Sequence, residues 1–463
     1  MSTTLDASGL AFAGAAHQAS LMASGEISAR ELTELYLERI ALLDPQLNAF
    51  RVVLAEQALV EADAADARRA RGEGGVLNGI PVAIKDDTDV AGQATPFGTA
   101  AHGGVKGADS AVVARLRGAG AVVIGKTHVP ELTICCFTET LTFGATLNPW
   151  DTNRTPGGSS GGSGAAVAAG LCGVAHGTDG AGSIRIPAAW CGVFGIKPQR
   201  DRVPLAPYDD AWYGLTTHGP IARTVADAAL FLDATADTGT TFAAAAARTP
   251  GPLRIALATN LPPGVLARPS ADALRAVHET ADQLRALGHS VIETAIEFRP
   301  VDGASVMVRY LAGIARALEP LEHPERVEPR TKSFARLGAA IPRAFVEKAV
   351  AAGAGLVARV GRTFEQADVI LTPGPAKPPF EIGALHGRGA LRTLNAMLAR
   401  VPYYGAYNAT GQPAASVPAG FDGDGLPLAV QLVGRADDEA TLLSLAAQLE
   451  QARPWAHHRP VVS

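Results

Sequence analysis

Short apolar runs alternate with longer segments of helical periodicity along most of the chain. Runs of four to eight apolar residues bounded by turn residues are typical of buried strands, and wider amphipathic spacing is typical of helices. The pattern predicts strands at 80–85, 121–124, 253–258, 290–295, 368–371, 415–417 and 428–433. It predicts helices at 6–23, 28–43, 54–71, 110–117, 224–234, 271–287 and 439–451, and further helices within 303–318 and 333–359. Strands alternating with helices indicate an α/β fold.

The segment 28–43 shows how local signals define one helix. Ser28 and Glu31 have the spacing of a capping box, in which each side chain accepts a hydrogen bond from the other residue's backbone N–H. Apolar residues then recur at helical spacing, and Pro45 is expected to end the helix.

Residues 155–187 form the most unusual stretch of the sequence. A glycine–serine loop at 157–163 leads into an alanine-rich helix, then a short apolar strand, then a second loop of small residues that carries Ser183. Glycines permit sharp turns and close approach of other groups, and a helix N-terminus favours negative charge. A flexible linker would not alternate with a helix and an apolar strand, so we interpret the two loops as presenting serines to a common site.

The predicted strand 80–85 ends in a lysine. Ile80, Val82 and Ile84 share one face of this strand, and Lys85 falls on the other. A lysine at the end of an apolar strand is by itself most often a surface residue. The acidic residues that follow, Asp86, Asp87 and Asp89, are interpreted as a solvated turn, although one of them could pair with Lys85.

Composition excludes several function classes. Hydrophobic residues make up 47% of the 463 residues, the net charge is −5 and no basic cluster occurs, so we expect neither nucleic acid nor a membrane as a partner. The N-terminus lacks a basic segment of a signal peptide, which favours a cytoplasmic location. The four cysteines have no metal-binding spacing, so we expect buried thiols, no metal and no cofactor.

Several motifs in order resemble the amidase signature family, which uses a Ser-Ser-Lys triad. They are GIPVAIKD (79–86), GKTHVPEL (125–132), NPWD (148–151), GGSSGGSGAAVAAG (157–170), TDGAGSIRIPAAWCGVFGIKP (178–198), GPIARTVADAA (219–229) and GQPAASVPAGFDGDGLPLAVQLVG (411–434). The resemblance implies a single α/β domain over 1–463, with a twisted mixed sheet covered by helices on both faces. Its catalytic core would span about 75–235 and 405–455, and a variable region at about 240–400 would select the substrate.

The resemblance also implies a mechanism. Ser183 aligns with the family's nucleophile, Ser159 with the bridging serine and Lys85 with the terminal base, which reverses the surface interpretation of that lysine. The lysine must be neutral to accept a proton, and burial would favour this. The backbone N–H groups of Gly180, Ala181, Gly182 and Ser183 would form the oxyanion hole. A cis peptide bond is expected between Gly158 and Ser159.

Two residues depart from the usual family pattern. Ala181 stands where glycine is commoner, and alanine resists positive φ, which puts the loop conformation in question but not the chemistry. Asp201 also replaces a glycine, and we expect it to affect a turn outside the site.

The candidate substrate-binding residues are Phe137, Gly158, Thr178 and Asp179. Phenylalanines such as Phe137 are, however, more often part of the core. Asp179 and Arg185 flank the nucleophile loop and could bind a charged substrate, but an ion pair that supports the loop is the favoured interpretation.

A histidine-based triad is the competing chemistry. His176 and His218 are available, and residues 157–161 spell G-x-S-x-G around Ser159. A nucleophile elbow should follow an apolar strand, however, and the preceding NPWDTNRTP is not one. We therefore favour the lysine-based triad.

The expected function is hydrolysis of a small-molecule carboxamide by a monomer or homodimer. The stretches AHGTDGAGSIRIPA and RPWAHHRP are similar to the branch of the family that hydrolyses 6-aminohexanoate cyclic dimer. The alternatives are a glutaminase-type subunit of a tRNA-dependent amidotransferase, which has the same triad, and a catalytically silent binding protein.

Overall fold

A mixed β-sheet forms the centre of the molecule. The computed structural model describes residues 7–208, 210–239 and 241–463. In these residues the main sheet has 11 strands in the order β1-β3-β2-β6-β8-β7-β12-β13-β11-β9-β10. The strands are β1 (Phe50–Val53), β2 (Pro81–Lys85), β3 (Val122–Thr127), β6 (Val174–Asp179), β7 (Phe194–Lys197), β8 (Thr217–Ala222), β9 (Arg254–Leu257), β10 (Ser290–Glu293), β11 (Val369–Pro373), β12 (Ala414–Phe421) and β13 (Pro427–Val433). A small separate hairpin consists of β4 (Glu139–Thr140) and β5 (Gly144–Ala145).

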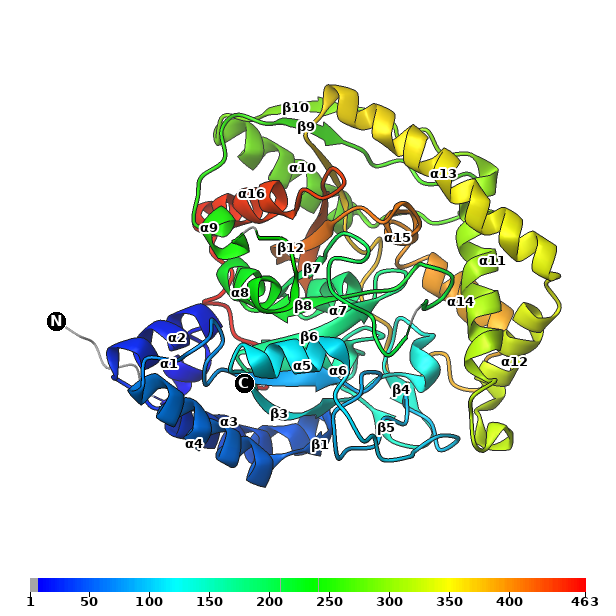
Figure 1. Cartoon of the computed structure of the whole chain (residues 1–463). Helices are drawn as coiled ribbons and strands as arrows, with labels where there is room; N and C mark the ends of the chain where they lie inside the picture. Colours follow the sequence, from blue (N-terminus) through cyan, green and yellow to red (C-terminus); the bar gives the residue numbers. More distant parts are fainter. Residues whose placement is uncertain (1–6, 209, 240) are drawn as a thin grey trace.

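Helices surround this sheet, which confirms the predicted α/β class (Figure 1). They are α1 (Ala7–Ala11), α2 (Ala15–Ser24), α3 (Ala29–Leu47), α4 (Ala55–Ala70), α5 (Ala111–Gly118), α6 (Gly161–Ala168), α7 (Arg185–Trp190), α8 (Val225–Thr235), α9 (Phe242–Ala246), α10 (Ala271–Ala286), α11 (Pro300–Ala317), α12 (Pro329–Ala339), α13 (Arg343–Gln366), α14 (Ala390–Leu398), α15 (Gly405–Thr410) and α16 (Glu439–Ala452). Helices α11 to α14 form a layer at one side of the sheet, drawn in yellow-green to orange in Figure 1.

The register of two parallel strands positions the predicted site. Strand β2 pairs in parallel with β6, with Val82 opposite Val174 and Ala83 opposite Ala175. The carboxyl ends of parallel strands meet at one edge of a sheet. Lys85 therefore comes close to the end of β6, from which the chain continues into the loop that carries Ser183.

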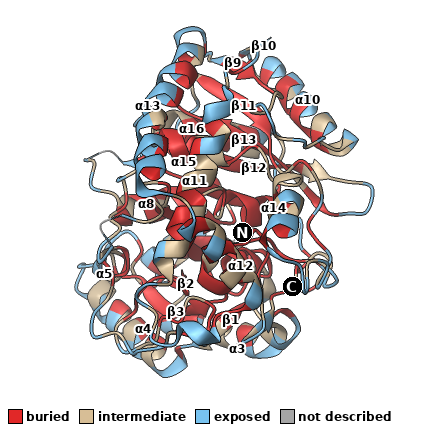
Figure 2. Cartoon of the chain, turned by 90° about the vertical axis from the view of Figure 1, so that its right-hand side faces the viewer, coloured by how far each residue is buried: buried red, intermediate tan, exposed pale blue. Residues whose placement is uncertain are grey.

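Small residues allow the glycine–serine segment to enter the core. Every residue of α6 is buried. The strands β2 and β3, which contact α6, are buried as well (Figure 2). A side-chain carbon at Gly162 would lie 2.5 Å from the carbonyl oxygen of Ala49 and 2.5 Å from the backbone nitrogen of His128. No residue larger than glycine fits at that distance, so the composition of this segment follows from its packing.

Three helix predictions need correction. Helix α3 continues past Pro45 to Leu47, because a proline in the last turn removes only its own N–H from the helix. The helix predicted at 6–23 is two helices separated at Gly14, where φ is +82°, and its first residue lies outside the described residues. The segment within 333–359 is likewise divided between α12 and α13, because Pro342 has extended φ and ψ and precedes the first turn of α13.

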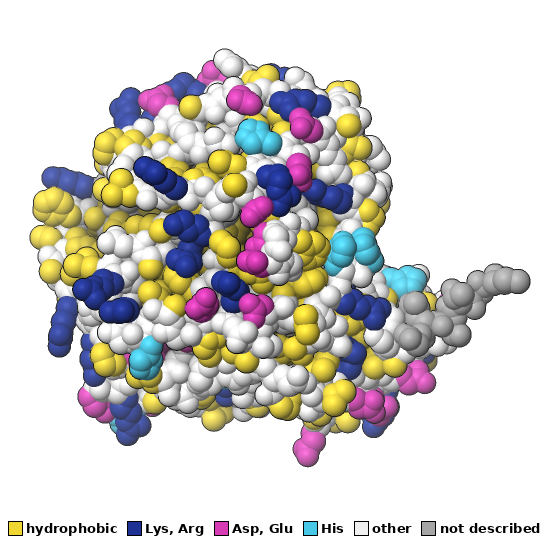
Figure 3. Space-filling model, turned by 180° about the vertical axis from the view of Figure 1, so that it is seen from behind, with side chains coloured by type: hydrophobic (Ala, Val, Ile, Leu, Met, Phe, Trp, Pro, Cys, Tyr) yellow, Lys and Arg dark blue, Asp and Glu magenta, His cyan; other side chains and the backbone are white. Residues whose placement is uncertain are grey.

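The surface carries both signs of charge. On the face opposite to that of Figure 1, basic, acidic and apolar side chains all occur (Figure 3). Within the described ranges, no helix has the length and apolar character needed to cross a membrane. The four cysteines are buried free thiols, as predicted.

Candidate active site

Lys85 ends β2 inside the protein rather than at its surface. Its side chain is fully buried, and its Nζ atom lies 2.8 Å from Ser159 Oγ. Nζ also donates a hydrogen bond to Thr178 Oγ1, at the end of the neighbouring strand β6. The structure therefore brings together the lysine and the first of the two loop serines.

The acidic turn after Lys85 is part of the same network, which corrects the prediction of a solvated turn. Asp87 Oδ2 lies 3.1 Å from Lys85 Nζ and accepts a 2.6 Å hydrogen bond from Thr178. Asp86 is buried and pairs with Lys126 and Arg51 instead. No local signal in the sequence indicates these two ion pairs, because Lys126 comes from the distant strand β3 and Arg51 from β1.

The charges of Lys85 and Asp87 respond to burial in different ways. Burial lowers the pKa of the Lys85 ammonium, while the carboxylates of Asp87 and Asp179 oppose that shift. Burial alone would raise the pKa of Asp87, but the Lys85 charge and the hydrogen bond from Thr178 outweigh it and hold the pKa at about 2. The lysine thus has one cause that favours its neutral form and a close carboxylate that favours its charged form.

Ser159 lies in a tightly packed loop before α6. The Gly158–Ser159 peptide bond is cis, as predicted. A side-chain carbon at Gly158 would lie 2.6 Å from the carbonyl oxygen of Cys135, so this position requires glycine. The next serine, Ser160, donates its backbone N–H to the Ser183 carbonyl oxygen at 3.2 Å and joins the two loops.

The second loop connects β6 to α7 and carries Ser183, which is half-buried. Its positive φ falls at Gly182 (+116°), whereas Ala181 is not among the residues with positive φ. Alanine at 181 is therefore compatible with the loop, which answers the question raised by the sequence. Asp201, the second departure, has a φ of +66° and lies in a turn before β8.

The backbone N–H groups of the Ser183 loop differ in whether they already donate a hydrogen bond. The Gly182 N–H donates to Asp179 Oδ1 at 2.6 Å, so it is already engaged. The hydrogen bonds of the described residues include none donated by the N–H groups of Gly180, Ala181 or Ser183. These three remain candidates for an oxyanion hole, and Gly182 supplies the loop conformation.

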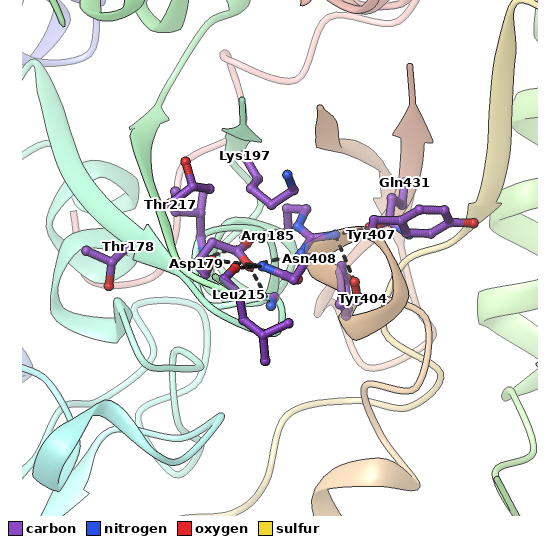
Figure 4. A network of polar contacts seen from close by, with 12 residues as sticks. Thr178, Asp179, Arg185, Lys197, Leu215, Thr217, Tyr404, Tyr407, Asn408 and Gln431 are labelled. Carbon is purple, nitrogen blue, oxygen red and sulfur yellow. Dashed lines mark hydrogen bonds and ion pairs between the residues drawn. The ribbon is translucent and has the colours of Figure 1, made fainter. Parts of the chain in front are cut away.

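A buried ion pair holds this loop in place (Figure 4). The Arg185 guanidinium contacts both carboxylate oxygens of Asp179 at 2.9 Å, and both side chains are fully buried. Arg185 also donates to Asn408 in α15 and to Gln431 in β13, both at 2.6 Å. Asp179 and Arg185 therefore connect the loop to α15 and β13. They form the ion pair that was favoured from the sequence as a support for this loop.

The two histidines form a pair of their own. His176 Nε2 and His218 Nδ1 lie 2.6 Å apart. Burial lowers the pKa of both, to about 4 for His218. Among the described residues, neither ring has a hydrogen bond to Ser159 or Ser183, so the histidine-based triad does not form.

Two cavities meet at Ser183. The first, which we call the apolar cavity, has a volume of about 350 Å³, and its lining includes Ile186, Val306, Met307, Leu394, Met397 and Val401. The second, which we call the mixed cavity, has a volume of about 670 Å³, and its lining includes Asp87, Ser159, Thr178, Lys106, Asp210 and Arg316. Thr133, Ser183 and Trp212 line both cavities.

The remaining predicted substrate-binding residues have different places. Thr178 lines the mixed cavity, whereas Phe137, Gly158 and Asp179 line neither cavity. Phe137 is 1% exposed and packs edge-on against Phe380 with ring centres 5.6 Å apart. Sequence reasoning missed Trp212, which has no motif around it and reaches the site only through the fold.

Comparison with known proteins identifies the family of this chain. The amidase family model matches residues 31–443. The chain is 54% identical over 462 residues to a protein named "putative amidase AmiB2" of Mycobacterium tuberculosis (strain ATCC 25618 / H37Rv), covering 99% of this chain and 100% of that protein. It is 35% identical to the 6-aminohexanoate-cyclic-dimer hydrolase of Paenarthrobacter ureafaciens, covering 96% of this chain and 95% of that protein.

Solved structures show the same similarity. A structure of 6-aminohexanoate cyclic dimer hydrolase complexed with substrate superposes with a TM-score of 0.89 at 31% identity, covering 98% of this chain and 100% of that one. A bacterial aryl acylamidase superposes with a TM-score of 0.84 at 26% identity, covering 98% and 97%. With the motifs, the fold and the family match in agreement, the chain belongs to the amidase signature family of carbon–nitrogen hydrolases.

Proposed function

We propose that this protein hydrolyses a small-molecule carboxamide to a carboxylate and an amine or ammonia through Lys85, Ser159 and Ser183. The observation that carries the proposal is the 2.8 Å contact between Lys85 Nζ and Ser159 Oγ inside the protein. A neutral lysine at this distance can accept the proton of the serine hydroxyl. Ser159 and Ser183 line the same cavity, so a substrate bound there can reach both.

The reaction proceeds in two halves. Ser183 attacks the amide carbonyl while its proton passes to Ser159, and the proton of Ser159 passes to Lys85. The oxyanion is stabilised by N–H donors from Gly180, Ala181 and Ser183. As the carbon–nitrogen bond breaks, Ser159 gives its proton to the departing nitrogen and receives one from Lys85, which becomes neutral again. A water molecule attacks the acyl-enzyme by the same proton path and releases the carboxylate.

The residues that region 240–400 contributes to the apolar cavity support the proposal that this region selects the substrate. It contributes Pro262 to Val265, the inner side of α11, and α14 to the apolar cavity. The catalytic groups come instead from β2, the loop before α6 and the loop after β6. Selection and chemistry are thus assigned to different parts of the chain.

The test compares the wild type with two matched serine variants. We expect Ser183→Ala to abolish release of amine from a panel of aliphatic, aromatic and cyclic amides. Ser160→Ala should retain activity, because the one hydrogen bond of Ser160 Oγ within the described part of the chain goes to the Thr178 carbonyl oxygen, at 3.3 Å. Equal activity of Ser183→Ala and the wild type would refute the triad. Glutamine belongs in the panel, since turnover of glutamine alone would favour the amidotransferase subunit.

A further inference from the structure

The two cavities at Ser183 differ in charge. In the apolar cavity, Asp302 is the one carboxylate among the lining residues that the structure describes. It is 2% exposed, forms an ion pair with Arg359, and accepts a 2.7 Å hydrogen bond from the Arg299 N–H at the start of α11. Its charge is therefore neutralised within the protein and is not presented to a ligand.

The other polar groups of the apolar cavity are uncharged or already paired. Burial raises the pKa of the Cys135 thiol to about 12, and it also raises that of Cys136. The Tyr310 hydroxyl donates its hydrogen bond to the Ile134 carbonyl oxygen. A charged ligand group would lose its hydration here without gaining a partner, so the apolar cavity favours an uncharged, apolar occupant.

The mixed cavity has the opposite character. Lys106, Asp210, Arg316 and Glu319 all line it. Arg316 lies 3.7 Å from Asp210, and both side chains are more than one-third exposed, at 56% and 39%. These groups remain hydrated and can accommodate a polar ligand.

The position of Ser159 distinguishes the two ends of the substrate. Ser159 lines the mixed cavity but not the apolar cavity. In the proposed mechanism Ser159 gives its proton to the departing nitrogen, so that nitrogen must face the mixed cavity. The acyl carbon bonded to Ser183 then directs its substituent the other way, toward the apolar cavity. Of the candidate oxyanion donors, Ala181 lines the apolar cavity, Gly180 lines the mixed cavity, and Ser183 lines both.

We propose that the substrates are N-substituted amides with an uncharged apolar acyl group, which occupies the apolar cavity, and a polar amine portion, which occupies the mixed cavity. The inference rests on the proposed function. A dry cavity of about 150 Å³ holds benzene. The apolar cavity of about 350 Å³ is therefore large enough for one aromatic ring and a short alkyl chain.

Two positions on α11 allow each cavity to be filled separately. Gly303 lines the apolar cavity, and a side-chain carbon added there meets nothing within 4 Å. Ala317, at the other end of the same helix, lines the mixed cavity. Leucine is a better helix former than glycine, so Gly303→Leu should fold. Gly361→Leu on the exposed side of α13 is the matched control, because Gly361 lines neither cavity and also has open space around it.

The experiment measures kcat/KM for four amides made from two acyl groups and two amines: acetyl or 4-phenylbutanoyl, joined to methylamine or to the longer polar amine 2-(2-aminoethoxy)ethanol. We expect Gly303→Leu to lower kcat/KM for 4-phenylbutanoyl methylamide at least tenfold more than for the acetyl amide of 2-(2-aminoethoxy)ethanol. We expect Ala317→Leu to show the opposite order. Gly361→Leu should behave as the wild type. Thermal unfolding of each variant reports whether it has folded.

Other outcomes would separate the inference from the proposed function. If Gly303→Leu lowers kcat/KM mainly for amides with the larger amine, and Ala317→Leu mainly for amides with the larger acyl group, the assignment of the cavities is reversed and the inference is wrong. If the wild type cleaves acetyl amides but no 4-phenylbutanoyl amide, the inference is wrong and the proposed function stands. If the folded wild type cleaves none of the four and none of the wider amide panel, both are wrong.

Discussion

Replacement of Asp179 by asparagine tests whether the buried ion pair holds the nucleophile loop. The Asp179 carboxylate accepts hydrogen bonds from the Gly182 N–H at 2.6 Å, from the Ile184 N–H at 3.1 Å and from Asn408 Nδ2 at 2.8 Å, besides its contacts with Arg185. Asparagine keeps the shape but leaves the buried guanidinium without a counter-charge. Loss of one partner of a buried pair costs about 3–5 kcal/mol.

The pH dependence of this effect has a definite sign. Burial opposes ionisation of Asp179, but the Arg185 charge and the hydrogen bonds outweigh it and hold the pKa well below its ordinary value. A lowered pKa in the folded state stabilises the protein above the unfolded value of about 3.9. That stabilisation is lost as the pH falls through the folded-state pKa. The full difference between wild type and Asp179→Asn should therefore be measured at neutral pH and shrink in acid.

The assay is urea unfolding at pH 7 together with amide hydrolysis. We expect Asp179→Asn to lose about 3–5 kcal/mol of unfolding free energy and about 100-fold in kcat, since displacement of a catalytic group by about 1 Å can cost that much. The matched control is Asp368→Asn, whose ion pairs with Arg254 and Arg435 are partly exposed and should each contribute about 1 kcal/mol or less. Equal losses in the two variants would refute the role of the buried pair.

Three further substitutions test the triad and its loop. Asp87→Asn removes a carboxylate that lies 3.1 Å from Lys85 Nζ, and its removal lowers the pKa of the lysine. The acid limb of the pH profile of kcat/KM should therefore move to lower pH. An unmoved limb would show that another group titrates. Lys85→Arg should abolish activity, because a guanidinium keeps its proton, and hydrolysis at the wild-type rate would exclude Lys85 as the base. Gly182→Ala places a side-chain carbon 2.8 Å from atoms of Ile186 and Tyr404, at a residue whose φ is +116°. We expect it to lower the free energy of unfolding by about 1–3 kcal/mol. A free energy of unfolding equal to that of the wild type would show that the loop can relax.

The three residues of the proposed triad could be proposed from the sequence because each lies in a contiguous motif. Lys85, Ser159 and Ser183 lie in three such motifs, and the fold brings Lys85 against Ser159 and both serines to one cavity. The cis bond before Ser159 was also predicted. The sequence did not reveal that Asp87 pairs with Lys85, because the same acidic residues can occur in a solvated turn or in a buried one.

Local interactions were determined by the sequence itself. The capping box of Ser28 and Glu31 forms as predicted, because both partners lie within one helical turn. The short apolar runs likewise predicted most strands, because a strand inside a sheet that is covered on both faces is apolar along its length. Predictions of helix ends were less accurate at Pro45 and Pro342. A proline can lie inside a helix or precede one, and which of the two occurs depends on the conformation of the adjacent residues.

Only the tertiary structure decided the shape and charge of the two cavities. The apolar cavity combines Cys135, Trp212, Val265, Met307 and Leu394, which come from segments far apart in the chain. Its lack of free charge depends on Arg359 reaching Asp302 from another helix. Substrate fit depends on distances between such segments, and these are set by long-range packing and not by the pattern of neighbouring residues. The sequence therefore determined the reaction class, and the fold decided which groups can surround the amide bond.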